Sequence, residues 1–302
     1  MKKLTINDIY ICDMPENWNE LSADHIKALC KYVNFALTPI SLKMMMLLYI
    51  SRLKLVKSKG IPAPGGLFDK TLFPVKGKTT GLFYAASADI SFMAESLSFL
   101  FAEKNDGIFI ESRLVQNHFP VLRTSRLKSI YGPNSGLYNL TFAEFIRLET
   151  LYEKLGREDN PDIENRFCAV LYRPKDKAAD PDSPDFTGDL RETFNDHLLE
   201  KNARIASHLS RWQKNYIRLL FEGCRNFIID KHPNAFGTIE AGEPGRTTFE
   251  NFNQLVTSLS NKDLTKAREI RSAPLYDVMA QLEAFAIEGQ KMRELSNQKP
   301  KY

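Results

Sequence analysis

The residues Gly77-Lys78-Thr79-Thr80 are the first candidate for chemistry, because glycine, lysine and threonine in this order end a phosphate-binding loop. Such a loop needs another glycine five positions before the first, and Leu72 stands there instead. Without that glycine the backbone cannot wrap around phosphates, and Pro74 disfavours the strand that precedes such a loop. The pattern therefore argues against nucleotide binding at this position.

Histidines and aspartates lack the spacing of a metal site. His197 and His208 are eleven residues apart, which places them on one face of a helix but about three turns from each other, too far for one ion. Residues 176–189 contain five aspartates, but not the central glycine and closing glutamate of a calcium loop. We therefore expect neither a metal nor a cofactor.

The closest approach to an acid–base cluster is formed by Glu144, Glu149 and Glu153. Glu144 completes a helix-capping box with Thr141, and the other two have the spacing of a charged outer face. No serine lies in a Gly-x-Ser-x-Gly turn, and no cysteine has a histidine in the context of a known nucleophile. The sequence therefore predicts no catalytic residue, and we expect a protein that is not an enzyme.

Composition is that of a globular protein from a reducing compartment. The chain has 302 residues, 43% of them hydrophobic, enough for one large or two modest domains. Its four cysteines show neither metal, redox nor disulfide spacing. The most apolar stretch, residues 40–50, contains Lys43 and is shorter than the roughly 20 residues that span a bilayer, and no signal sequence is recognisable. We expect a cytoplasmic location and no membrane partner.

Positive charge is concentrated between residues 43 and 78, which hold eight basic side chains and one acidic one, although the whole chain carries only +4. Such a segment can neutralise phosphates. No aromatic residue lies between Lys54, Lys57 and Lys59 to stack on bases. The solvated end of a helix and the loop after it would explain the same charges. Nucleic-acid binding is therefore the alternative hypothesis, and its candidate residues are Lys54, Lys57, Lys59, Lys76 and Lys78.

The elements that position these residues are predicted to be mostly helices. Thr141 and Glu144 form a capping box flanked by an apolar staple pair, which specifies a helix start. Ser22 caps a predicted helix over 22–36 in the same way, and Thr38 followed by proline opens a second one over 38–57. We expect these two helices to pack as an antiparallel pair.

Apolar periodicity predicts the remaining elements. Helices are expected over 89–104, over 189–227 with a break near 200–202, over 249–259 and from 272 to 295. Glycine and proline predict loops over 60–86, 175–188 and 237–245, and short strands are expected at 108–110 and 119–122. The predicted fold is mainly α, an irregular multi-helix bundle with long loops and at most a small β-hairpin. Its regions are 1–130, with the basic Gly/Pro-rich loop, and 131–302, or the two form one continuous domain.

Four stretches resemble a family of uncharacterised proteins from Bacteroidetes phages and prophage-like tail gene clusters. They are Met-Pro-Glu-Asn-Trp-Asn-Glu-Leu at 14–21, the segment from Tyr-Gly-Pro-Asn-Ser-Gly to Ala-Glu-Phe at 131–145, Ala-Val-Leu-Tyr-Arg-Pro at 169–174, and Phe-Glu-Gly-Cys-Arg at 221–225. The resemblance implies a non-enzymatic role in a phage-like tail, as a structural protein or as an assembly chaperone that holds the tape-measure protein. It brings no catalytic residues, and it implies that the expected cytoplasm is that of a bacterial host.

A helical protein with 20 phenylalanines and eight methionines can offer an adaptable apolar groove to an amphipathic partner helix. Packing inside the core explains the same residues. The candidate groove residues are Met44, Met45, Met46, Met279, Phe285 and Met292. We expect a protein partner, which the resemblance identifies as a tail or tape-measure protein, and nucleic acid as the second choice.

Overall fold

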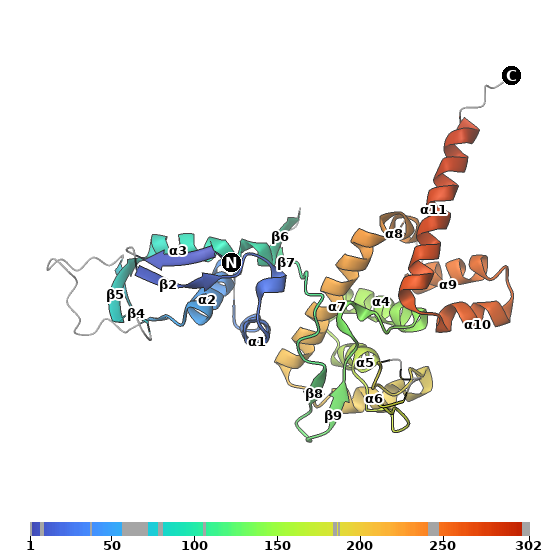
Figure 1. Ribbon diagram of the computed structural model, residues 1–302, viewed down its shortest axis with the longest axis horizontal. Helices are drawn as coiled ribbons and strands as arrows, with labels where there is room; N and C mark the ends of the chain where they lie inside the picture. Colours follow the sequence, from blue (N-terminus) through green and yellow to red (C-terminus); the bar gives the residue numbers. More distant parts are fainter. Residues whose placement is uncertain are drawn as a thin grey trace. The chain divides into compact units, whose positions relative to one another are not determined.

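The computed structural model describes residues 2–6, 9–36, 38–55, 72–77, 81–104, 107–183, 186, 188–240 and 248–297. Eleven α-helices and nine short strands in the described residues confirm the mainly α prediction (Figure 1). The chain divides into two compact units, Met1–Leu114 and Val115–Tyr302. The sequence suggested a division near residue 130. The segment from residue 115 belongs with the C-terminal helices instead, because the Phe119 N–H donates to the Tyr216 hydroxyl at 3.3 Å.

Three α-helices and seven strands form the described part of the N-terminal unit. They are β1 (Lys2–Ile6), β2 (Ile9–Met14), α1 (Ala23–Tyr32), α2 (Pro39–Ser51), β3 (Lys54–Leu55), β4 (Leu72–Gly77), β5 (Gly81–Ala86), α3 (Ser87–Ala94), β6 (Phe101–Lys104) and β7 (Gly107–Ile110). The strands form three antiparallel sheets, ordered β1-β2, β3-β4-β5 and β6-β7. The core lies between α1, α2 and the 3-10 turn Glu95–Leu100, and its fully buried residues include Ile26, Leu29, Leu47 and Leu97.

Both predicted helix starts of this unit are confirmed. The Ser22 hydroxyl accepts the His25 N–H at 3.2 Å, and the Thr38 hydroxyl accepts the Ser41 N–H at 3.2 Å. The second helix ends at Ser51 and not at 57, because Arg52 adopts a left-handed conformation with φ of 55° and β3 begins at Lys54. A left-handed residue is the usual stop of a helix.

Two predictions for residues 60–110 were wrong. Strands β4 and β5 form a hairpin inside the segment that the sequence predicted to be a loop. Pro74 belongs to β4, where it lies opposite Tyr84 of β5, and the described part of β3 pairs with Val75 and Lys76. The helix expected over 89–104 gives way to a 3-10 turn at Glu95 and then to β6, which pairs with β7. The piece at 108–110 therefore does not pair with the one at 119–122.

Eight α-helices and two strands form the described part of the C-terminal unit. They are β8 (Val121–Arg123), β9 (Ser129–Tyr131), α4 (Phe142–Arg157), α5 (Pro161–Leu171), α6 (Leu199–Ala206), α7 (Arg211–Lys231), α8 (Pro233–Glu240), α9 (Thr248–Leu259), α10 (Leu264–Ser272) and α11 (Leu275–Asn297). Strands β8 and β9 pair as an antiparallel hairpin. Aromatic rings fill the core. The ring centroid of Phe145 lies 6.3 Å from that of Phe221 and 6.1 Å from that of Phe252.

The predicted start of α4 is confirmed, since Thr141 N–H donates to Glu144 Oε2 at 2.8 Å and Glu144 N–H donates to Thr141 Oγ1 at 3.3 Å. The long periodic segment is two helices, and its break lies at residues 207–210 instead of 200–202. A second capping box causes this break, because the side chain of Gln213 accepts the Ser210 N–H at 2.8 Å. Helix α10 was not predicted, although Asp263 caps it through the Thr265 N–H.

Candidate functional site

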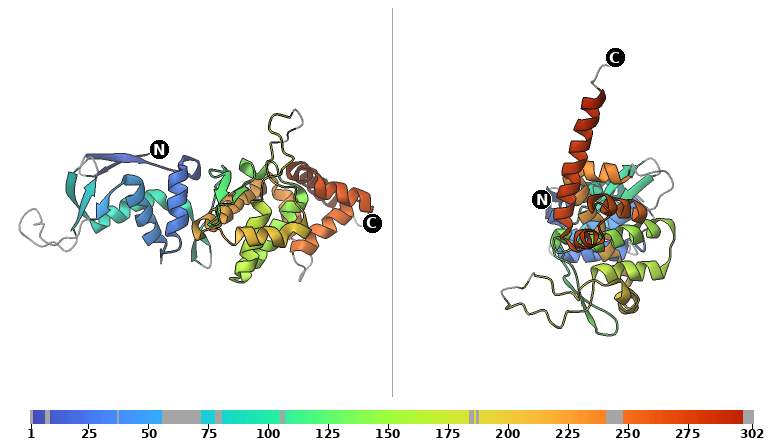
Figure 2. Two further views of the ribbon diagram at one scale, coloured as in Figure 1. Left: turned by 90° about the horizontal axis from the view of Figure 1, so that it is seen from below. Right: turned by 90° about the vertical axis from the view of Figure 1, so that its right-hand side faces the viewer.

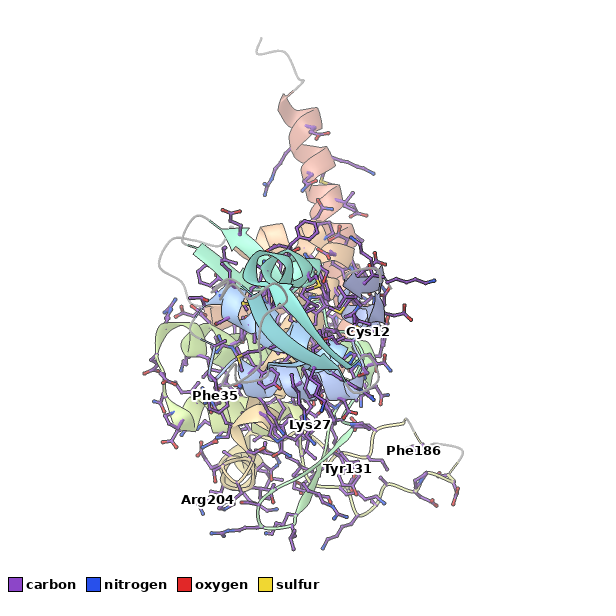
Figure 3. All side chains as sticks on the ribbon, turned by 90° about the vertical axis from the view of Figure 1, so that its left-hand side faces the viewer. Cys12, Lys27, Phe35, Tyr131, Phe186 and Arg204 are labelled. Atoms are coloured by element: carbon purple, nitrogen blue, oxygen red, sulfur yellow. The ribbon has the colours of Figure 1, made fainter. Side chains whose placement is uncertain are left out.

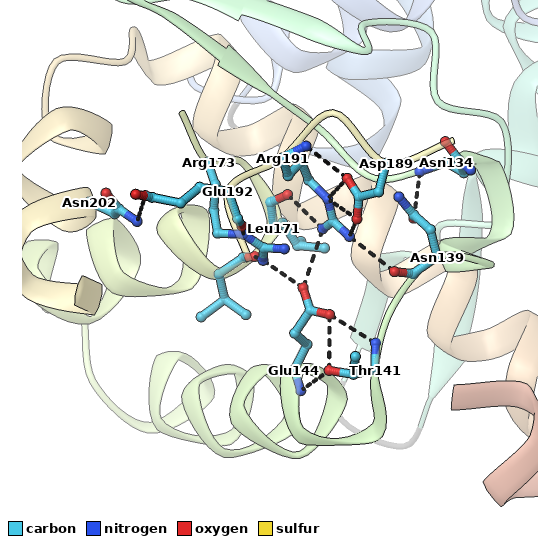
Figure 4. Close-up of polar contacts among 11 residues, drawn as sticks. Asn134, Asn139, Thr141, Glu144, Leu171, Arg173, Asp189, Arg191, Glu192 and Asn202 are labelled. Carbon is cyan, nitrogen blue, oxygen red and sulfur yellow. Dashed lines mark hydrogen bonds and ion pairs between the residues drawn. The ribbon is translucent and has the colours of Figure 1, made fainter. Parts of the chain in front are cut away.

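Four charged side chains meet inside the C-terminal unit, where the start of α4 faces the chain that follows α5 (Figure 4). Arg173 Nη1 lies 2.5 Å from Glu144 Oε1, Arg191 Nη2 lies 2.7 Å from Asp189 Oδ2, and Arg191 Nη1 lies 3.5 Å from Glu144 Oε1. Three of the four side chains are at most 3% exposed. Burial and the neighbouring Arg191 lower the pKa of the Arg173 guanidinium, and Glu144 opposes that shift.

This cluster supports the fold and offers no reactive group. Two positive and two negative charges balance each other. Backbone carbonyls take further donors, since Arg173 Nε donates to the Glu192 carbonyl at 2.6 Å and Arg191 Nη2 donates to the Asn139 carbonyl at 3.2 Å. Buried charges that are paired and hydrogen-bonded in this way fix the position of the segments that carry them. The cluster therefore ties residues 173–192 to the start of α4.

The other acidic and thiol side chains that could take part in catalysis are also buried in the core or paired. Glu149 was predicted on an outer face but is buried, and its Oε1 accepts Arg225 Nε at 2.7 Å. Burial raises the pKa of the Cys30 and Cys224 thiols to about 12 and raises that of Cys168 further, so none of the three is a thiolate at neutral pH. Among the described residues, no group of three or more His, Cys, Asp or Glu side chains is placed to hold a metal ion.

The predicted nucleic-acid segment is only partly described. Lys54 and Lys76 are exposed and stand opposite each other in the β3-β4 ladder. Lys57, Lys59 and Lys78 lie outside the described residues. Lys43, which adds to the charge of this segment, is buried, and its Nζ forms an ion pair with Glu95 Oε2 at 2.8 Å.

The six residues predicted for a partner groove fall into separate groups. Met44 and Met45 are half-buried and Met46 is fully buried on α2, in the N-terminal unit. Met279 is fully buried on α11, so neither Met46 nor Met279 is available to a partner. Phe285 and Met292, also on α11, are 56% and 70% exposed.

Phe285 lines a groove between α8, α9 and α11, which we call the α11 groove, with a volume of about 980 Å³. Its apolar lining comes from Leu282, Phe285 and Ala286 of α11 and from Leu255 and Leu259 of α9. Polar side chains complete the lining, and these are Asn234, Ser258, Asn261, Gln290 and Arg293. The groove therefore combines an apolar floor with polar groups.

The groove exists because α11 is longer than the helices that cover it. Its first turns bury Leu275, Met279 and Leu282. The same face continues with Phe285 and Gly289, and the end of α11 extends beyond the other helices of its unit (Figures 1 and 2). The apolar face of α11 therefore continues beyond the helices that cover its first turns.

One acidic side chain fixes α8 against α11. Glu283 Oε1 accepts Asn234 Nδ2 at 2.5 Å, and its Oε2 accepts the Ala235 N–H at 2.8 Å. Both walls of the groove also carry a glycine, Gly237 on α8 and Gly289 on α11, where an added Cβ would meet nothing within 4 Å. The hydrogen bonds of Glu283 therefore join two walls of the groove, and the two glycines leave space in its lining.

The sequence pointed to Phe285 but not to the α9 side of the groove. Leu255 and Leu259 were predicted as part of an amphipathic helix, and only the tertiary arrangement, which places them across the groove from α11, turns them into a wall. No described helix has the length and apolar character required to cross a membrane. Comparison with protein-family models, with curated proteins and with solved structures finds no match.

Proposed function

We propose that this chain is a non-enzymatic interaction protein that binds an amphipathic helix of a partner protein in the α11 groove. The observation that carries the proposal is the apolar face of α11, which continues past Leu282 into the groove with Phe285 exposed. A large exposed aromatic residue beside other apolar side chains is typical of a binding site.

The shape of the groove favours a helix over a compact small molecule. Its lining residues on α11 run from Leu282 to Arg293, at positions spaced as on one helix face. This stretch covers about three turns, or roughly 17 Å at the rise of an α-helix. A partner helix would place apolar side chains at positions i, i+3, i+4 and i+7 along it, and an acidic residue near Arg293 would complete its recognition.

The partner that we propose is a tail or tape-measure protein of a phage-like particle, and the present chain would be its assembly chaperone or a structural neighbour. Support comes from the sequence resemblance described above and from the fit between a long amphipathic helix and an elongated apolar groove. The buried thiols and the charge-balanced cluster of Glu144, Arg173, Asp189 and Arg191 are compatible with a role that involves no covalent chemistry.

The test uses the full chain and overlapping 25-residue peptides from the tape-measure protein of the same gene cluster, with binding measured by isothermal titration calorimetry. Gly289→Trp fills the open space in the groove. Gly156→Trp is the matched control, because Gly156 is also helical and an added Cβ there would also meet nothing within 4 Å, while Gly156 lies on an exposed position outside the groove.

We expect one peptide region to bind the wild type and the Gly156→Trp variant equally and to lose at least tenfold in affinity with Gly289→Trp. Equal binding by Gly289→Trp would reject the groove as the site. Failure of the wild type to bind any of the peptides would reject the tail assignment.

A second candidate function is nucleic-acid binding by the N-terminal unit, and the register of β3 and β4 favours it. Like charges directly opposite each other destabilise a sheet, and Lys54 and Lys76 are such a pair. An anion bound between them would relieve the repulsion. Binding of an oligonucleotide that weakens steeply with salt and is lost in Lys54→Ala/Lys76→Ala would support this function.

A further inference from the structure

A different surface of the C-terminal unit is rich in positive charge. Residues 121–131, which form the β8-β9 hairpin, and residues 201–214, which end α6 and begin α7, contain seven lysines and arginines and neither aspartate nor glutamate. The Ser125 N–H donates to the His208 carbonyl at 2.9 Å, and Gln213 Nε2 donates to the Arg123 carbonyl at 2.9 Å. The fold therefore packs one basic segment against the other, and we call the two together the hairpin surface.

Most of this charge is not neutralised by the protein. Glu164 pairs with Arg211 at 2.9 Å and with Lys214 at 3.4 Å, and Glu192 lies 4.0 Å from Lys201. Within the part of the chain that the structure describes, four exposed side chains of the hairpin surface form no ion pair, and these are Arg123, Arg126, Lys128 and Arg204. In Figure 3, side chains of the hairpin, near the label of Tyr131, and of α6, near that of Arg204, project from the lower edge of the view.

A hollow of about 460 Å³ lies where the hairpin meets the turn before α7. None of its described lining residues is acidic, and the side chains that matter are Arg123, Ser125, His208 and Trp212. Guanidinium, imidazole and hydroxyl groups donate hydrogen bonds to phosphate oxygens, and an indole ring offers a face for a nucleobase. The indole of Trp212 is half-buried and packs edge-on against Phe119, with ring centroids 5.5 Å apart. The contact with Phe119 therefore orients the indole before any ligand binds.

The tip of the hairpin adds a second feature. Leu127 is 81% exposed between Arg126 and Lys128, and its φ of 57° lies in the left-handed region. A leucine rarely adopts this conformation. An apolar side chain flanked by basic ones is typical of proteins that insert a wedge between bases while cations hold the phosphates.

We propose that the hairpin surface binds nucleic acid, with its basic residues on the phosphate backbone and Trp212 against a base. Nucleic acid fits better than an acidic protein, because both can meet the charges but only nucleic acid also supplies bases that can stack on an indole and contact an exposed leucine. This site lies in another unit of the chain from Lys54 and Lys76, and it does not involve the α11 groove.

The test measures fluorescence anisotropy of a labelled 20-nucleotide oligo-dT with the full chain between 50 and 200 mM salt. The variant is Arg123→Gln/Arg126→Gln/Lys128→Gln. The control is Lys175→Gln/Lys177→Gln/Lys266→Gln, which removes the same charge from exposed positions of the same unit. Lys54→Ala/Lys76→Ala tests the N-terminal site, and circular dichroism verifies that each variant is folded.

We expect a salt slope of about −3 for the wild type, because each of four phosphate contacts contributes about −0.7 on a single strand. The hairpin variant should lose at least tenfold in affinity, with its slope falling to about −1, and the control should stay within twofold. In a Trp18→Phe background, where Trp212 is the remaining tryptophan, oligo-dT should quench the emission.

Four results would each overturn the proposal: no binding by the wild type, equal losses in the hairpin variant and its control, a loss confined to Lys54→Ala/Lys76→Ala, or an unquenched Trp212. Equal affinity for polyglutamate or for anionic vesicles would also overturn it, because the surface would then recognise negative charge and not nucleic acid.

Discussion

Replacing Phe285 with alanine separates binding from folding at the α11 groove. A phenylalanine buries roughly 200 Å² when fully covered, and this side chain is 56% exposed in the free protein. A partner that covers the rest would remove about 110 Å² from water, worth about 2.8 kcal/mol at about 25 cal/mol per Å². We therefore expect Phe285→Ala to weaken partner binding by up to about 100-fold.

The same substitution should cost little stability, because Phe285 is 56% exposed in the free protein. Leu282, three residues earlier on the same face, is 6% exposed. Leu282→Ala should lower the free energy of unfolding by about 2–5 kcal/mol, as core leucines do. Urea unfolding of the three proteins, together with calorimetric titration of the tape-measure peptides, measures both effects. Equal destabilisation by the two variants would refute the reasoning, since it would mean that Phe285 is covered in solution.

Three further predictions concern the C-terminal unit. Glu144→Gln should destabilise it by about 3–5 kcal/mol, because the buried Arg173 and Arg191 would lose their buried carboxylate and only Asp189, which is partly exposed, would remain. Gly132→Ala should cost about 1–3 kcal/mol, since the new Cβ would clash with the ring of Tyr172. Stability should also fall above pH 8. The raised pKa values of Cys168 and Cys224 keep both thiols protonated in the folded state, whereas in the unfolded chain each titrates near pH 9, so each contributes a loss of about 1.4 kcal/mol between pH 8 and pH 10.

Denaturant unfolding measures all three effects, and matched variants isolate their causes. Glu153→Gln removes a surface charge paired with Arg157 on the same helix and should cost less than about 1 kcal/mol. Gly156→Ala adds a Cβ in open space and should be neutral or stabilising. Replacing both cysteines with alanine should flatten the alkaline decline whatever it does to absolute stability. A change at Glu153 as large as at Glu144, or an unchanged pH profile, would contradict these explanations.

Local signals predicted helix starts well and helix ends poorly. The Thr141–Glu144 and Ser22 caps involve residues three apart, so the sequence contains the whole interaction. The break before α7 has the same kind of signal, since Ser210 and Gln213 are three apart, but apolar periodicity on both sides hides it. The sequence therefore contained the signal for this helix start, although the prediction missed it.

Pairing between distant segments was not readable from the sequence. Nothing in the order of residues announces that Ser125 bonds to His208, or that Arg173 and Arg191 return to Glu144. Glu144 had a sufficient local explanation as a capping residue, and the structure gives it a second role. When a local interaction already explains a residue, the sequence gives no sign that the residue has a second, long-range role.

Met279 and Phe285 show where this limit touches function. Both belong to one apolar helix face with the same periodicity, and both were candidates for a partner groove. One is fully buried and the other 56% exposed. The difference arises where the neighbouring helices cease to cover α11, and the Glu283 contacts with Asn234 and Ala235 join α8 to α11 at this point. Periodicity defines which face of a helix is apolar, but tertiary packing decides how much of that face the chain covers itself. The uncovered remainder is the part that a partner can bind, and for this reason the proposal rests on Phe285 and no longer on the methionines.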